Sequence, residues 1–163
     1  MPSYVAVIGP GDGATEDECA HARAAAATLA SRGVVIVTGG LGGVMGAAAE
    51  GAASVGGASI GLLPGRDRER AHPALTYAIP TGLGELRNGL VVRSADCVLA
   101  VGGSWGTLSE LALAVRTGTP VVALHGWELD RDGPETAVDV ADAVSRVLAH
   151  LRVPVTAPTP GSV

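Results

Sequence analysis

The chain alternates short runs of consecutive apolar residues with longer segments rich in small and apolar residues. The apolar runs predict strands at residues 4–9, 34–38, 58–64, 75–80, 96–103 and 119–126. The longer segments predict helices at residues 15–33, 44–56, 81–95, 107–118 and 136–151. Strands that are apolar throughout are buried on both faces, and their alternation with helices favours right-handed crossovers. The pattern therefore predicts a doubly wound α/β fold with a parallel sheet and helices on both faces.

The length of 163 residues, of which 47% are hydrophobic, suits one domain with a substantial core. We expect a single Rossmann-like, nucleotide-binding domain over residues 1–152 and a disordered tail over residues 153–163. There is no phenylalanine, and only two Trp and two Tyr, so the core must be aliphatic. Many of the helical positions are Ala or Gly, which predicts helices packed very close to the sheet.

All the basic residues are arginines, because the sequence contains no lysine. This excludes a Schiff-base lysine and a P-loop lysine. The net charge of −5 argues against a general nucleic-acid surface, which needs a basic stripe. The start of the chain, MPSYVAVIG, enters a strand without a signal-peptide pattern, and no apolar stretch is long enough to span a membrane. We expect a soluble cytoplasmic protein that engages neither nucleic acid nor membrane.

No metal site or resident cofactor is predicted. Cys19 and Cys97 have no metal-ligand spacing and are interpreted as small core residues. The four histidines are scattered singly and are interpreted as surface or loop residues, although the one in LHGW follows a strand and can border a cleft.

Glycine-rich turns follow three of the predicted strands, at the sheet edge where ligands bind in folds of this kind. Each turn brings backbone N–H groups and a helix N-terminus to the same place, which favours an anion. A dinucleotide is disfavoured because the second strand ends in VTGG, where a ribose-binding acid is expected. The turn residues predicted to contact a phosphorylated ligand are Gly9, Gly11, Gly39, Gly40, Gly42, Gly43, Gly103, Ser104, Gly106 and Thr107.

The segment VGGSWGTLSE, residues 101–110, resembles the PGGxGTxxE signature of the LONELY GUY family and its lysine-decarboxylase-like relatives. The resemblance covers nearly the whole chain, through GPGDG, TGGLGGVMGAAAEGA and RNGLVVRSADCVLAVGG in the same order. Within that superfamily the chain is most similar to the branch of small Rossmann-like proteins that includes molybdenum-cofactor carriers. Lysine decarboxylation is not expected of a chain without lysine.

The resemblance implies an activity and the residues that carry it. Cytokinin-activating members cleave a nucleoside 5′-monophosphate into free base and ribose 5-phosphate, and their arginine and glutamate correspond to Arg87 and Glu110. The sequence departs from their pattern, because Leu86 replaces a glutamate and Asn88 a lysine, while Gly102 and Ser104 replace a proline and a glycine. Arg87 would provide a fixed charge for phosphate, with Asn88 beside it, and Glu110 would stabilise a sugar cation or orient water.

Several residues allow a structural interpretation as well. Thr107 and Glu110 have the spacing of a capping box, which stabilises any helix start. Trp105 either fixes the glycine loop to the core or stacks on a base. Met45 and Glu50 favour packing and surface roles. The charged segment at residues 64–74 is either a solvated loop or a flap whose arginines meet the ligand.

Two functions remain open at this point. The first is binding of a purine nucleoside 5′-monophosphate at the glycine turns, with phosphoribohydrolase activity on the N-glycosidic bond. The alternative is a non-catalytic carrier of the molybdenum cofactor or another phosphorylated ligand. The resemblance also implies a homodimer, paired or not into a tetramer, formed by the helices on either side of the glycine signature; apolar residues on more than one face of both helices agree with this.

Overall fold

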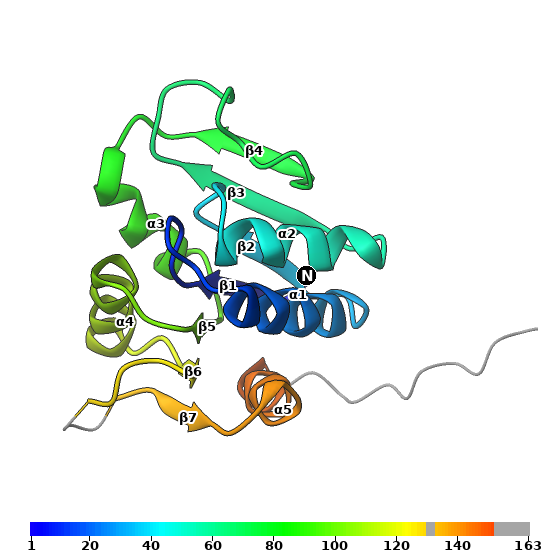
Figure 1. Ribbon diagram of the computed structural model, residues 1–163, viewed down its shortest axis with the longest axis vertical. Helices are drawn as coiled ribbons and strands as arrows, with labels where there is room; N and C mark the ends of the chain where they lie inside the picture. The colour runs from blue at the N-terminus through cyan, green and yellow to red at the C-terminus, as the bar shows by residue number, and fades with distance from the viewer. Residues whose placement is uncertain (130–132, 152–163) are drawn as a thin grey trace, which may run out of the picture.

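The computed structural model describes residues 1–129 and 133–151 as a seven-stranded parallel sheet in the order β4-β3-β2-β1-β5-β6-β7 (Figure 1). The strand order changes direction at β1, which pairs with β2 on one side and with β5 on the other. The strands are β1 (Tyr4–Ile8), β2 (Val35–Thr38), β3 (Ser59–Leu63), β4 (Tyr77–Pro80), β5 (Cys97–Val101), β6 (Val121–Leu124) and β7 (Glu135–Ala137). The predicted tail at residues 153–163 lies outside the described residues.

Helices cover both faces of this sheet, as the alternating pattern predicts (Figure 1). One face is packed by α1 (Glu16–Ala30), α2 (Val44–Ser54) and α5 (Val140–Leu151). The other is packed by α3 (Asn88–Arg93), which continues the 3-10 turn η1 (Gly84–Arg87), and by α4 (Trp105–Thr117). Side chains alternate across each strand, so Val5 and Val7 of β1 join the first core while Ala6 and Ile8 join the second.

The small residues have the packing role that the composition predicts. Gly51 of α2 lies so close to α1 that a Cβ placed on it would meet the carbonyl oxygen of Arg23. The two helices therefore touch backbone to backbone, with Ala22, Ala25 and Ala26 buried between them and the sheet. At the other end of α1 the predicted capping box is confirmed: the Thr15 hydroxyl accepts from the Glu18 N–H, and the Glu18 carboxylate accepts from the Thr15 N–H.

Two predicted helices are shorter than expected. Residues 136–151 do not form one helix, because Glu135–Ala137 adds an edge strand beside β6 and α5 begins only at Val140. Residues 81–95 begin with an irregular turn, in which Gly82 and Gly84 have positive φ angles, before η1 and α3. Both differences arise at element boundaries, where sheet pairing and glycine conformation override helical spacing. No helix within the described residues is long and apolar enough to cross a membrane.

The charged segment at residues 64–74 is a loop, and it is attached to its surroundings at two points. The Arg68 Nε donates to the carbonyl oxygen of Ala78 on the edge strand β4 at 2.8 Å. The His72 N–H donates to the carbonyl oxygen of Gly40 at 3.0 Å, and the His72 ring lies 3.6 Å from the Glu50 carboxylate. The loop therefore packs beside the second glycine turn.

Candidate functional site

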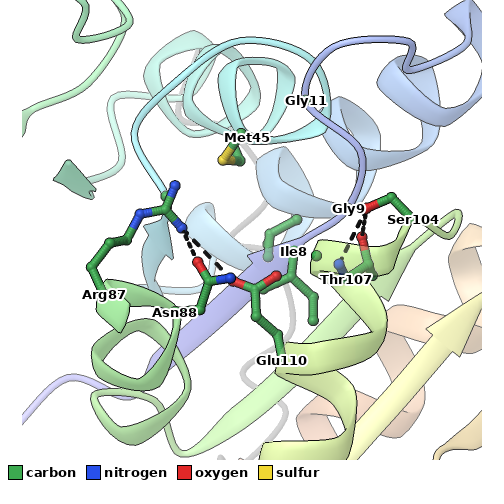
Figure 2. A pocket seen from close by; sticks show the side chains of 12 residues that line it. Ile8, Gly9, Gly11, Met45, Arg87, Asn88, Ser104, Thr107 and Glu110 are labelled. Atoms are coloured by element: carbon green, nitrogen blue, oxygen red, sulfur yellow. Dashed lines mark hydrogen bonds and ion pairs between the residues drawn. The ribbon is translucent and has the colours of Figure 1, made fainter. Parts of the chain in front are cut away.

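The three glycine-rich turns meet above the carboxyl ends of β1, β2 and β5, where they enclose a cavity of about 160 Å³ (Figure 2). The position agrees with the sequence prediction, because it lies at the point where the strand order changes direction. The cavity is lined by Val7, Ile8, Gly9, Gly11, Gly39, Met45, Arg87, Asn88, Ser104, Gly106, Thr107 and Glu110. Nine of these twelve residues belong to the set that the sequence predicts.

Gly9 and Gly39 allow close packing around this cavity, because neither position has room for a side chain. A Cβ on Gly9 would lie 2.4 Å from the carbonyl oxygen of Val101, so β1 and β5 can approach closely only with glycine there. A Cβ on Gly39 would lie 2.6 Å from the Arg87 Nη2 and 2.5 Å from the Met45 Sδ. The backbone of the second turn is therefore the surface against which the Arg87 guanidinium packs.

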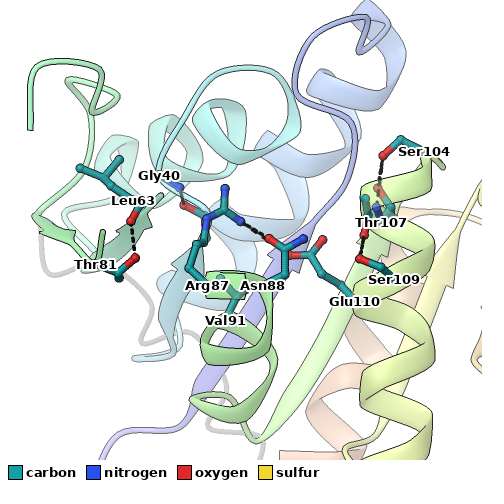
Figure 3. Close-up of polar contacts among 12 residues, drawn as sticks. Gly40, Leu63, Thr81, Arg87, Asn88, Val91, Ser104, Thr107, Ser109 and Glu110 are labelled. Atoms are coloured by element: carbon teal, nitrogen blue, oxygen red, sulfur yellow. Dashed lines mark hydrogen bonds and ion pairs between the residues drawn. The ribbon is translucent and has the colours of Figure 1, made fainter. Parts of the chain in front are cut away.

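Arg87 lies at the end of η1 with only 8% of its surface exposed. Its Nη1 donates to the Asn88 side-chain oxygen at 2.5 Å, which orients the guanidinium toward the cavity (Figure 3). Its Nε is buried and has no hydrogen-bond partner among the described residues. Burial lowers the pKa of Arg87, and the nearby Glu110 carboxylate acts in the opposite direction. This side chain is a buried cation with unused donor capacity.

Glu110, on the second turn of α4, points toward Arg87 and Asn88 (Figure 2). Its Oε1 is 3.9 Å from the Arg87 Nη1, at the outer limit of an ion pair, and the residue is 7% exposed. Burial raises the pKa of Glu110 to about 7, although the Arg87 charge partly offsets this effect. The carboxyl group therefore changes its charge near neutral pH, which is a common property of functional carboxylates.

The start of α4 supplies hydroxyl groups and a helix N-terminus to the cavity. Ser104 is the N-cap: its Oγ accepts from the Thr107 N–H at 3.2 Å and lies 2.9 Å from the Thr107 hydroxyl. The capping-box interpretation of Thr107 and Glu110 is therefore wrong, because Thr107 is inside the helix and the Glu110 side chain faces Arg87 instead of the helix start. With Gly106 beside them, these groups provide donors and a favourable dipole for an anion.

The other predicted turn residues shape the site without lining the cavity. Gly43, with φ 63°, is the N-cap of α2 and packs on the carbonyl oxygen of Gly11, which fixes the first turn against the second. Gly40, with φ 79°, packs on β3, and Gly103 packs on the Trp127 ring. Gly42 has open space around its Cα.

Trp105 does not fix the glycine loop to the core, so that interpretation is wrong. The side chain is 78% exposed and lies outside the cavity lining. It meets Trp127 edge to face, with ring centroids 4.9 Å apart and an interplanar angle of 79°. The only two tryptophans of the chain thus form a pair beside the start of α4.

Sequence reasoning missed three residues of the lining, namely Val7, Ile8 and Met45. Val7 and Ile8 read as ordinary strand residues, but they end β1 immediately before the first glycine turn. Met45 was assigned to packing, yet it occupies the first turn of α2, and its side chain points toward the cavity in Figure 2. The feature of the sequence that indicates this role is its position two residues after Gly43, in a helix start at the sheet edge where ligands bind.

The histidines are less isolated than their spacing indicates. His21 of α1 and His125 after β6 lie with ring centroids 5.0 Å apart, and His150 contacts the Glu135 carboxylate at 2.8 Å. In the described part of the chain, no group of three or more His, Cys, Asp or Glu side chains is arranged to hold a metal ion.

Two proteins of known structure that share this fold are named for binding or carrying the molybdenum cofactor. The molybdenum cofactor binding protein of the phototrophic bacterium Rippkaea orientalis is 32% identical, with a TM-score of 0.88 over 93% of this chain and 98% of its own. The molybdenum cofactor carrier protein of Chlamydomonas reinhardtii is 33% identical, with a TM-score of 0.87 over 94% of this chain and 100% of its own.

Comparison of the sequence with known proteins and families also finds relatives over most of the chain. An uncharacterised protein of Archaeoglobus fulgidus is 38% identical over 120 residues, which cover 74% of this chain and 78% of that protein. The sequence model of the SLOG cluster4 family matches residues 2–153, nearly the full chain. The resemblance to LONELY GUY-like proteins is thereby confirmed, and the chain belongs to the SLOG cluster4 family.

Proposed function

We propose that this protein binds a phosphorylated small molecule in the cavity at the glycine turns and serves as its carrier, with the molybdenum cofactor as the leading candidate. The observation that supports this most directly is the buried Arg87, whose Nε lacks a partner and whose guanidinium faces the N-terminus of α4 across the cavity. A phosphate placed between them would receive charge-assisted hydrogen bonds from one side and helix N–H groups from the other.

The cavity is large enough to hold part of a ligand but too small to enclose a whole one. About 160 Å³ is close to a cavity that accommodates one benzene-sized ring, and well below the roughly 300–1,000 Å³ of sites that bury a whole drug-sized ligand. The phosphate and the group next to it therefore fit inside, while a pterin or purine ring projects outward. A carrier benefits from this arrangement because its ligand stays accessible to the next protein. The similar solved structures from Rippkaea and Chlamydomonas, named for binding and carrying the molybdenum cofactor, support the same role.

A second candidate function is hydrolysis of a purine nucleoside 5′-monophosphate. Its supporting observation is Glu110, a carboxyl group with a pKa near 7 that faces the anion site. A carboxylate there can stabilise a sugar cation or orient water. Among the described residues that line the cavity, no second acidic side chain is present to protonate the leaving base, so turnover would be slow.

One experiment separates the two functions. The protein is produced in cells that synthesise the molybdenum cofactor, purified without oxygen, and analysed for bound molybdenum and for pterin fluorescence after oxidation. The same protein is incubated with purine 5′-monophosphates, and free base is quantified by chromatography. We expect bound molybdenum and pterin in equal amounts and little base release. Base release abolished in Glu110→Gln, without bound pterin, would instead establish the hydrolase.

Two arginine variants complete this test. Arg87→Ala removes the buried cation of the cavity, whereas Arg93→Ala removes an exposed arginine from the same helical region. The carrier proposal expects loss of bound pterin only in Arg87→Ala. Equal retention in both variants would contradict a phosphate site at Arg87.

We also propose that the protein forms a homodimer through the surface of η1 and α3. Leu83, Leu86 and Leu90 are 45%, 80% and 43% exposed there, in one short stretch of chain. Exposed leucines grouped on one surface are typical of an association site. Because η1 carries Arg87, this interface would lie next to the cavity. Light scattering during size-exclusion chromatography tests the proposal, and a monomeric mass would contradict it.

A further inference from the structure

The cavity combines many hydrogen-bond donors with a single acidic side chain. The Arg87 guanidinium, the Asn88 amide, and the hydroxyl groups of Ser104 and Thr107 all line it. Glu110 is the only carboxyl group among the lining residues, and it is almost fully buried. A carboxylate in an anion site repels the anion unless a proton lies between them.

Among the described residues, Glu110 has one charged partner, Arg87 of η1, whose Nη1 lies 3.9 Å away. The next residue, Asn88 of α3, also lines the cavity and is neutral. The lining residues from β1, from the glycine turns, from α2 and from the start of α4 carry no charged or titratable carboxyl, imidazole or amine groups. The charge balance of the cavity is therefore decided by Arg87, Glu110 and the ligand.

Arg87 has two side-chain neighbours within the protein that interact with its charge. Its Nη1 donates to the Asn88 oxygen at 2.5 Å (Figure 3) and lies 3.9 Å from the Glu110 carboxylate. An entering anion competes with the Glu110 carboxylate for the same cation. Protonation of Glu110 removes this competition and converts the carboxyl group from a repelling neighbour into a hydrogen-bond donor.

We infer that an anionic ligand enters this cavity together with one proton, which Glu110 holds in the complex and releases when the ligand leaves. The inference rests on the proposed anion site and adds the regulation of that site. The only bond that forms is the O–H bond of the Glu110 carboxyl group: hydronium or a buffer acid in solvent gives up the proton, and the new O–H is directed toward an oxygen atom of the ligand. Alkaline conditions consequently favour release, and mildly acidic conditions favour capture.

The coupling between protonation of Glu110 and anion binding can be measured as a change of affinity with pH. Because burial raises the pKa of Glu110 to about 7, most of the free protein carries a charged Glu110 above neutral pH. If only the protonated form accepts the anion, affinity falls about tenfold for each pH unit above that value. In Glu110→Gln the amide is neutral at every pH, so its affinity does not fall, and at about pH 9 it exceeds that of the unmodified protein by roughly 100-fold.

Isothermal titration calorimetry with adenosine 5′-monophosphate and with sulfate tests the inference. Sulfate is the cleaner probe because it remains a dianion across the range, so any proton taken up belongs to the protein. Each titration is performed at about pH 8 in two buffers of different ionisation enthalpy, and the difference reports the protons bound, expected to be about one. Glu110→Gln should bind without proton uptake, whereas Glu85→Gln, which changes an exposed carboxylate on η1, should behave as the unmodified protein.

The outcomes separate the inference from the function on which it rests. Binding of both anions with proton uptake that disappears only in Glu110→Gln supports it. Binding with no proton uptake, or with uptake unchanged in Glu110→Gln, overturns the inference and leaves the anion site intact. No binding of either anion to any of the three proteins at any pH overturns the proposed function, and the inference with it.

Discussion

Replacing Glu110 with Gln should stabilise the protein above neutral pH. The pKa of Glu110 rises from its usual value of 4.5 to about 7 because the folded protein buries the carboxylate. Between these two values the folded state binds more protons than the unfolded state, so stability decreases as pH rises through this interval and then stays constant. A shift of this size corresponds to about 3 kcal/mol, since one pKa unit is about 1.4 kcal/mol.

The Gln variant resembles the protonated carboxyl group and avoids this cost. At about pH 8 its free energy of unfolding should therefore be higher by about 3 kcal/mol, or its melting temperature by roughly 6 to 12 °C for a domain of this size. At about pH 4 the two proteins should differ little, because Glu110 is then mostly protonated in both states. Calorimetric melting of both proteins from about pH 4 to pH 9 provides the comparison. A constant difference across the range, or a less stable variant at alkaline pH, would refute the reasoning.

Three further predictions concern the shape and surroundings of the site. Gly39→Ala should weaken sulfate binding by about tenfold or more, because the new methyl group would displace the Arg87 guanidinium. Gly42→Ala, where a Cβ would meet no other atom within 4 Å, should bind sulfate normally in the same calorimetric titration. Leu86→Glu should convert the proposed dimer to a monomer in light scattering and leave the fold intact by circular dichroism, because Leu86 is 80% exposed in the single chain. A dimer that persists in this variant would contradict an interface at Leu86. Trp105→Ala should weaken the binding of adenosine 5′-monophosphate about fivefold, because the exposed ring is placed to stack on a base outside the cavity, and it should leave the affinity for sulfate unchanged. An equal loss of affinity for both ligands would contradict stacking.

Most of the fold follows from local patterns in the sequence. The central strands β1, β5 and β6 consist almost entirely of buried apolar residues. Their alternation with alanine-rich helices predicts a parallel sheet covered on both faces. The sequence does not predict strand β7, because it has only three residues and two of them are exposed. Its pairing with β6 stabilises it. The same dependence on a neighbour explains why the start of α5 was placed too early. Short edge elements are stabilised by tertiary contacts that local spacing does not contain.

The site was predictable to the extent that backbone conformation determines it. Glycine turns after three strands indicate an anion site at one sheet edge, and the structure brings all three to one cavity. Met45 was missed because its role depends on which turn of α2 faces that edge. The sequence leaves two roles open for Trp105, because its partner Trp127 lies 22 positions later, in a loop with no strong pattern.

The chain contains the spacing of a capping box twice, and comparison of the two shows what separates a structural carboxylate from a functional one. At the start of α1, Thr15 is the N-cap and Glu18 completes the box. At the start of α4, Ser104 occupies the N-cap one turn earlier, so its hydroxyl satisfies the Thr107 N–H that would otherwise need a partner. The Glu110 side chain is therefore not needed to cap the start of α4. The capping by Ser104 leaves this carboxylate available to face Arg87, and the buried position that results explains why its charge responds to pH near neutrality.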